Sequence, residues 1–325
     1  PLPRKDLGVA TCNLNKLQKN VSKIRRFLAS NGLKEIINYS FIDKKSAELF
    51  CEDNNLVMLS NSISSEMTHL RPSLIPGLLE SVKKNHAKGL SDFAIFEIGQ
   101  IFYGSEPGQE KLELSGVFSG YNNDRNAFQN RILFDIYDAK FCIEESLQTI
   151  GINPDSLFLD REVPDYCHPN KSAFIKLGKF KKIGLFGELN PKFTNKYGFK
   201  NNPIVFSIFL EEIIEKKDKL KNVKFENSPY PSVIRDFAFV VDEKIEVKNI
   251  IKTISKINSE LIIGIKLFDV FEGKKAHEQI GNNKKSLGFE VIIQSKDRTL
   301  QENEIEDLSQ KIILNVTEVT GGSLR

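Results

Sequence analysis

The segment from Arg235 to Arg325 carries the most restrictive pattern in this chain, because helical and strand-like periodicities follow one another there in a clear order. Alternation of apolar and polar residues indicates a strand with one buried face, and apolar residues at steps of three and four indicate an amphipathic helix. The expected elements are a strand, a helix, two strands, a helix and a short strand, at residues 235–241, 247–257, 261–271, 285–294, 304–319 and 322–325.

This order fits a four-stranded sheet with both helices on one face, the ferredoxin-like β-α-β-β-α-β arrangement. In the strand expected at 285–294, every second residue from Leu287 to Ile293 is apolar. Ser286 and Glu290 therefore belong to the opposite face, which the helices leave open. By the same period of two, Asp269 and Phe271 share a face of the neighbouring strand.

The first two thirds of the chain combine helices with a succession of strands. Apolar residues from Leu14 to Leu28 recur at helical spacing up to Gly32, and Ile37, Tyr39 and Phe41 alternate with polar residues as in a half-buried strand. Short turns between successive strands favour an antiparallel sheet flanked by helices over a doubly wound parallel sheet. Further helices are expected at 73–89 and 134–150, and further strands at 93–103, 113–120, 173–177, 182–188 and 204–210.

Length and local composition indicate two domains. A chain of 325 residues exceeds what one hydrophobic core usually supports. Residues 211–226 are rich in Lys and Glu, and Pro229 and Pro231 follow directly, as in a linker. The sequence therefore predicts an α+β protein with domains at 1–222 and 228–325.

Composition excludes several classes of protein. No apolar run approaches the roughly 20 residues that cross a bilayer, so no membrane association is expected. The four cysteines are widely spaced, which favours reduced cytosolic thiols over a disulfide scaffold or a zinc site. The net charge of +3 does not indicate nucleic-acid binding, so a surface for RNA must be local, as in the basic stretch 273–285. Pro1 replaces an initiator Met without a secretory signal, and we interpret the chain as a segment of a longer protein.

Three motifs in order resemble the synthetase-like module of phenylalanyl-tRNA synthetase β subunits of bacterial type: Gly-Leu-Lys-Glu-Ile-Ile-Asn-Tyr-Ser-Phe at 32–41, Leu-Arg-Pro-Ser-Leu-Ile-Pro-Gly-Leu-Leu at 70–79 and Phe-Glu-Ile-Gly at 96–99. Later motifs resemble the anticodon-binding domain of the same family: Arg-Asp-Phe-Ala-Phe-Val-Val at 235–241, Leu-Phe-Asp-Val-Phe at 267–271, Lys-Ser-Leu at 285–287 and Asp-Arg-Thr-Leu at 297–300. The resemblance covers nearly the whole chain.

The resemblance implies the C-terminal portion of such a β subunit, with a class II synthetase-like module followed by an anticodon-binding domain. It implies a cytoplasmic ligase built from two α and two β subunits that aminoacylates the phenylalanine tRNA. This portion would support the α subunit and bind the anticodon region of the tRNA. ATP and magnesium would serve the whole enzyme, and no cofactor is expected in this chain.

Motif departures argue against catalysis by this chain. Class II synthetases hold ATP with arginines, but Tyr103 stands where the resemblance places one of them, and residues 205–212 lack both glycine and arginine and end in Glu211-Glu212. One remaining arginine, Arg71, cannot form an ATP site, and a structural role at the start of a helix is favoured for it. The histidines have no ligand partners at metal spacing, so no metal site is expected.

The resemblance places Asp269, Phe271 and Ser286 among the anticodon-contacting residues. Phe271 offers a ring for stacking, although the family more often has tyrosine there, and Asp269 and Ser286 offer hydrogen-bonding groups for a base edge. The alternative is that Phe271 caps the edge of the core and that the nearby lysines are solvated charges. The cations expected to attract the phosphates are Lys274, Lys275, Lys284, Lys285 and Arg298.

Two other functions stay open from sequence alone: a free-standing RNA-binding protein derived from a synthetase, and an enzyme with its own active site. The motif departures disfavour the enzyme. The apolar stripe from Leu14 to Leu28 also has two readings, as a helix at an interface with the α subunit or as a helix of the internal core.

Overall fold

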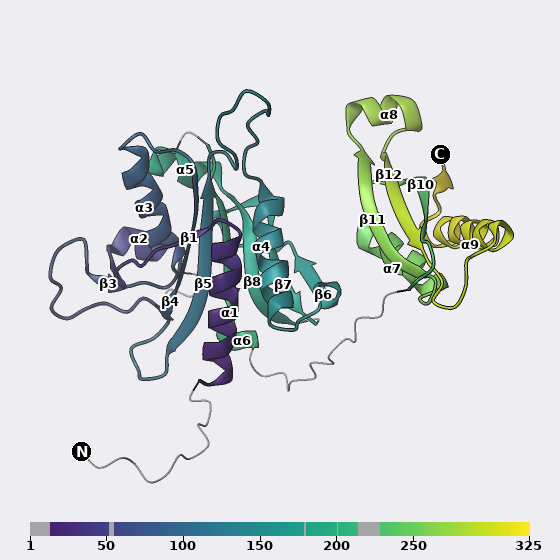
Figure 1. Ribbon diagram of the computed structural model, residues 1–325. Coiled ribbons are helices and arrows are strands. Elements are labelled where there is room, and N and C mark those ends of the chain that lie inside the picture. The colour runs from purple at the N-terminus through teal and green to yellow at the C-terminus, as the bar shows by residue number, and fades with distance from the viewer. Residues whose placement is uncertain (1–13, 52–54, 179, 200, 214–227) are drawn as a thin grey trace, which may run out of the picture. The chain divides into compact units, whose positions relative to one another are not determined.

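The computed structural model describes residues 14–51, 55–178, 180–199, 201–213 and 228–325. The chain divides into two compact units, Pro1–Leu220 (unit 1) and Lys221–Arg325 (unit 2) (Figure 1). The linker expected between 211 and 226 lies mostly outside the described residues. None of the described helices is long and apolar enough to cross a membrane.

Unit 1 is built on a seven-stranded sheet in which all neighbouring strands are antiparallel except β1 and β4, which run parallel. The expected antiparallel sheet is confirmed, apart from this edge. In spatial order the strands are β1 (Lys34–Glu35), β4 (Phe93–Phe102), β5 (Glu110–Ser119), β9 (Ile204–Phe209), β8 (Lys181–Leu189), β7 (Cys167–Leu177) and β6 (Leu157–Asp160).

Helices cover both faces of this sheet. On one face α1 (Lys16–Ser30) and α4 (Ile136–Thr149) lie side by side over one apolar core (Figure 1). On the other face α3 (Ile75–His86) packs over a second core. The shorter elements are α2 (Lys44–Leu49), α5 (Pro191–Tyr197), α6 (Leu210–Ile213), the 3₁₀ turn Pro154–Ser156 and the small ladder β2 (Phe41–Ile42) and β3 (His69–Leu70).

The apolar stripe of α1 belongs to the first of these cores. Ile24 and Leu28 are fully buried, and Leu17 and Val21 pack against the same cluster. Asn15 begins the helix by accepting the backbone N–H of Gln18 in a capping box. The internal-core reading of the stripe is therefore the one that the structure supports.

The segment between β1 and β2 contradicts the expected strand, because its polar side faces inward. Ile37 and Tyr39 are 89% and 75% exposed. Asn38 instead turns toward the sheet, where its amide donates to Glu97 Oε2 over 2.7 Å. A buried carboxylate must be paired or hydrogen-bonded, and this requirement outweighs the burial of two apolar side chains.

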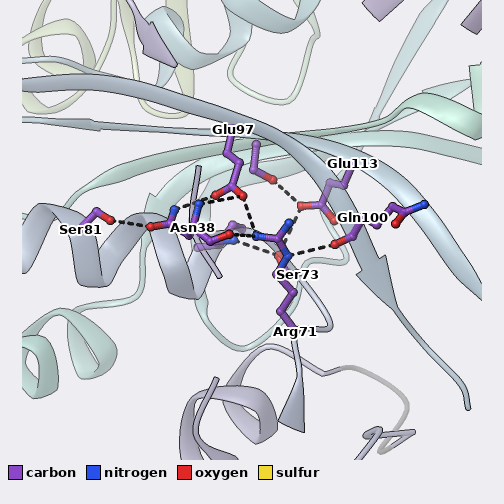
Figure 2. Close-up of polar contacts among 9 residues, drawn as sticks. Asn38, Arg71, Ser73, Ser81, Glu97, Gln100 and Glu113 are labelled. Carbon is purple, nitrogen blue, oxygen red and sulfur yellow. Dashed lines mark hydrogen bonds and ion pairs between the residues drawn. The ribbon is translucent and has the colours of Figure 1, made fainter. Parts of the chain in front are cut away.

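Asn38 and Glu97 belong to a buried polar network that joins three segments distant in sequence (Figure 2). Arg71 Nη1 lies 2.6 Å from Glu97 Oε1, and the two side chains are only 7% and 1% exposed. Arg71 Nε donates to the carbonyl of Gln100 over 3.0 Å, and Ser81 of α3 donates to Asn38 Oδ1 over 2.8 Å. The network thus fixes α3 and the 36–40 segment to strand β4.

Unit 2 forms a four-stranded antiparallel sheet in the spatial order β11-β12-β10-β13. The two central strands, β10 and β12, are the first and third of unit 2 in sequence, as the ferredoxin-like expectation requires. Helices α7 and α9 contribute to one core with the apolar sides of β10 and β12. The elements are β10 (Val233–Asp242), α7 (Val247–Ile257), β11 (Ile262–Phe271), α8 (Lys274–Ile280), β12 (Lys284–Ile293), α9 (Glu302–Thr320) and β13 (Ser323–Leu324).

Two details of unit 2 test the expected faces and turns. The apolar residues of β12 from Leu287 to Ile293 are fully buried at every second position, so the face assigned to the core is confirmed. The sequence pattern predicted no helix in the basic stretch between β11 and β12, but α8 forms there with its N-terminus at Gly273. Gly273 has φ +87°, a backbone conformation that favours glycine.

Breaking the buried ion pair should destabilise unit 1 far more than breaking an exposed one. We expect Arg71→Met to lower the free energy of unfolding by about 3–5 kcal/mol, because it leaves the Glu97 carboxylate buried without its cation. The matched control is Arg25→Met. Arg25 Nε lies 2.8 Å from Glu35 Oε1, but the side chains of Arg25 and Glu35 are 45% and 31% exposed. Loss of an exposed pair costs about 0–1 kcal/mol.

Urea unfolding of both variants, followed by circular dichroism, measures the difference. Equal losses for the two variants would contradict the structural role assigned to Arg71.

Candidate functional site

Unit 1 contains a cavity of about 420 Å³ on the sheet face that carries α3. Tyr103, Lys111, Glu113, Lys182 and Glu212 are among the residues that line it. Its ability to hold a polyphosphate depends on cations that are not already neutralised.

One carboxylate, Glu212, already neutralises the cation Lys111 at one side of this cavity. Glu212 accepts from Lys111 over 3.0 Å and from Lys181 over 3.3 Å. The hydrogen bond from Lys111 lowers the pKa of Glu212, so the carboxylate is charged at neutral pH. Lys111 also lies 5.2 Å from the ring centroid of Tyr103. Arg71 is occupied by Glu97, which agrees with the structural role expected for it.

Glu113 is the most deeply buried acid at the cavity wall, and its position makes it a poor ligand for phosphate. Ser207 donates to Glu113 Oε1 over 3.1 Å, Ser73 does so over 3.4 Å, and Ser115 also donates to this oxygen. Burial raises the pKa of Glu113, and the three hydroxyls act in the opposite direction. A carboxyl at this point rejects anions whenever it is ionised.

No grouping of three or more histidine, cysteine or acidic side chains among the described residues could hold a metal ion. His69 lies 2.8 Å from the hydroxyl of Thr68, His86 lies 3.2 Å from the hydroxyl of Ser119, and His168 accepts the backbone N–H of Asn170. Cys142 and Cys167 are buried, and burial raises the pKa of the Cys142 thiol to about 12.

In unit 2 the structure brings Asp269, Phe271 and Ser286 together on the sheet face opposite the core. We call this surface the open face. Phe271 is directly opposite Ser286 in the ladder between β11 and β12, and Asp269 is opposite Gly288. Asp269 is exposed, Phe271 is half-buried and Ser286 is only 2% exposed. Asp269 is therefore the most accessible of the three predicted contacts.

Two further residues on this face were not predicted from the sequence. The guanidinium of Arg325 lies 5.5 Å from the ring centroid of Phe271. Phe268 is 59% exposed, and its ring reaches the backbone of Gly288. A β-bulge between Leu267 and Asp269 places Phe268 there, and strict alternation does not predict bulges. The run Leu267-Phe268-Asp269, with two large apolar residues in succession, is the only sequence signal of it.

The predicted cations do not form one cluster. By the alternation of β12, Lys284 lies on the side of the open face and Lys285 on the side of the core. Arg298 follows the opposite end of β12 and pairs with Glu304. The strand β12 runs from Lys284 to Ile293, 10 residues, so its two ends are separated by roughly 30 Å. Lys274 and Lys275 begin α8, and their side chains lie outside what the structure describes.

Two family profiles together match most of the chain. The profile described as the phenylalanyl tRNA synthetase beta chain CLM domain matches residues 6–210, and the ferredoxin-fold anticodon binding domain matches residues 228–325. A solved pyrrolysyl tRNA synthetase from Desulfitobacterium hafniense aligns with a TM-score of 0.46 at 16% identity, over 61% of this chain and 65% of that one. That likeness is too low to add to the argument.

Similar curated proteins carry one name, phenylalanine–tRNA ligase beta subunit. The protein of Cereibacter sphaeroides is 39% identical and that of Ruegeria pomeroyi 36% identical, each over 100% of this chain and 40% of its own length. The protein of Brucella abortus is 34% identical over 96% of this chain and 39% of its own length. The chain thus spans about two fifths of the relatives it matches, and it belongs to the family of phenylalanyl-tRNA synthetase β chains.

Proposed function

We propose that this chain is part of the β subunit of a cytoplasmic phenylalanine–tRNA ligase, in which unit 2 binds the anticodon region of the tRNA and unit 1 supports the catalytic α subunit. The observation that carries the proposal is the open face, where Asp269 and Phe271 stand next to each other on one accessible side of a sheet. Unpaired bases are commonly read on such faces by stacking and hydrogen bonding.

Unit 1 would act as a scaffold, and ATP and magnesium would bind in the α subunit. The arrangement of charges supports this division. Arg71 is engaged with Glu97, Lys111 is paired with Glu212, and the buried Glu113 stands at the wall of the cavity. A transferring phosphoryl group needs free cations that point toward it.

The contact with the α subunit is proposed at the exposed pair Ile37 and Tyr39, in an assembly of two α and two β subunits. Both side chains project into solvent from a segment that Asn38 fixes to Glu97. Large exposed apolar side chains often mark a protein interface. A segment that is already rigid loses little conformational entropy on association.

The chain alone should not activate phenylalanine. We expect no phenylalanine-dependent exchange of pyrophosphate into ATP, because Glu212 pairs with Lys111 and the buried Glu113 stands at the wall of the cavity of unit 1. A complete native ligase serves as the positive control. Exchange that falls when Lys111 is changed to Ala would belong to this chain, not to a contaminant, and would contradict the proposal.

Charge placed on the Ile37–Tyr39 segment should weaken assembly without unfolding the chain. We expect Ile37→Asp to lower the affinity for the cognate α subunit, measured by analytical ultracentrifugation, because it buries an unpaired carboxylate in the contact. Phe180→Asp is the matched control, since Phe180 is also 89% exposed but lies in the β7–β8 turn. If both variants assemble like the parent, the α subunit binds elsewhere.

Residues of the open face should have separable effects on tRNA binding. Loss of a stacking ring costs about 1–3 kcal/mol per base, so Phe271→Ala should weaken binding roughly 5- to 150-fold with little change in salt dependence. Asp269→Ala should mainly reduce the preference among anticodons, because a carboxylate near phosphates is favourable only where it accepts from a base.

Lys284→Ala should lower the magnitude of the salt slope by about 0.7–0.9, the contribution of one phosphate contact. Lys256→Ala is its control, since Lys256 is an exposed cation in the last turn of α7, on the helix-covered side of the sheet. Binding of wild-type and anticodon-mutated tRNA is titrated across salt concentrations. If Phe271→Ala and Asp269→Ala bind every tRNA like the parent, the open face does not read the anticodon.

A further inference from the structure

The open face carries a second aromatic side chain that the expected contacts do not include. In the ladder between β11 and β12, Leu267 pairs with Phe289 and Asp269 pairs with Gly288, so Phe268 is the extra residue of the bulge. A bulge places two successive residues opposite one residue of the partner strand. Phe268 and Asp269 consequently both lie over Gly288.

Gly288 leaves room for the ring of Phe268. A Cβ atom at Gly288 would lie 3.0 Å from Phe268 Cζ, 3.2 Å from its Cε2 and 3.1 Å from Asp269 Cβ. One edge of the ring therefore lies against the space that a side chain at residue 288 would occupy. The contact restricts the ring, so a ligand that stacks on it needs to order little more of the side chain.

The two rings of the open face differ in accessibility. Phe268 is 59% exposed, whereas Phe271 is half-buried and has the Arg325 guanidinium 5.5 Å from its ring centroid. Stacking needs an accessible ring face, because base and ring must come into van der Waals contact. Phe268 presents the larger free aromatic surface.

We propose that Phe268 is the main stacking plane of the open face and takes one unpaired base of the anticodon loop, while Phe271 takes a different base. This inference rests on the proposed function. Phe268 lies over Gly288, and Phe271 is opposite Ser286. These two residues of β12 are two positions apart, which corresponds to roughly 7 Å along the strand. That spacing is about twice the 3.4 Å between stacked bases, so one base cannot use both rings in the same way.

The surroundings of Phe268 suit a base better than a protein segment. Asp269 is exposed beside the ring, and Lys266 and Glu290 form an ion pair over 3.1 Å farther along the same face. A protein interface typically offers a contiguous apolar patch and few charges at its centre. A base combines an apolar face for the ring with polar edges, one of which can donate to Asp269.

The test measures binding of the full chain to the anticodon stem-loop of a phenylalanine tRNA. We expect Phe268→Ala to weaken binding roughly 5- to 150-fold. Phe268→Tyr should retain most of the affinity, and Phe268→Leu should lose most of it, because leucine has apolar bulk without a ring. Ile234→Ala is the matched control, since Ile234 is 52% exposed and occupies the same sheet face on β10.

Stem-loops that lack one base of the anticodon at a time identify the stacked nucleotide. On the stem-loop without the partner base of Phe268, the Phe268→Ala variant should bind like the parent. The Phe271→Ala variant should bind like the parent on a different stem-loop, the one that lacks the base stacked on Phe271. Thermal unfolding of each variant checks that the fold is retained.

Several results would overturn the inference. If Phe268→Ala binds like the parent while Phe271→Ala is weakened, the anticodon function stands but Phe268 has no part in it. If Phe268→Leu binds like the parent, or if the Phe268→Ala loss is the same on every stem-loop, stacking is excluded. If the parent binds no stem-loop, the proposed function fails, and this inference fails with it.

Discussion

The buried ion pair between Arg71 and Glu97 is the interaction on which the α3 side of unit 1 depends. Two charges out of water are stable only if nearly every hydrogen-bonding group around them is used. Glu97 accepts from Asn38 as well as from Arg71, and Arg71 donates to the carbonyl of Gln100. The turn of Asn38 toward the sheet, the exposure of its neighbours and the position of α3 all follow from this requirement.

The same pair explains why unit 1 can resemble a synthetase without its chemistry. An arginine engaged on several sides by the protein has little capacity left for a phosphate. At the cavity Lys111 is likewise engaged, by Glu212. A fold does not by itself determine function, which depends on accessible groups such as Ile37 and Tyr39 in unit 1 and the open face in unit 2.

Much of the fold could be predicted from the sequence, because long elements carry periodic patterns. Helix α7 was predicted at the residues where it lies, and the buried side of β12 was correct. The inward turn of Asn38 could not be predicted, since it depends on a carboxylate 59 residues away. The bulge at Phe268 and the separation of Arg298 from Lys284 depend on ladder register, which periodicity leaves undetermined. Asp269, Phe271 and Ser286 were placed together correctly, whereas the most exposed ring beside them was missed.

Gly99 makes the polar network of unit 1 depend on a residue that has no side chain. A Cβ atom at this position would lie 2.3 Å from Arg71 Nη2, so the guanidinium fits only while residue 99 has no side chain. Glycine, arginine and glutamate therefore form a set whose members cannot be exchanged one at a time without a clash or an unpaired buried charge. An engineered change at any one of the three positions therefore has to be accompanied by changes at the other two if the interior of unit 1 is to stay packed and paired.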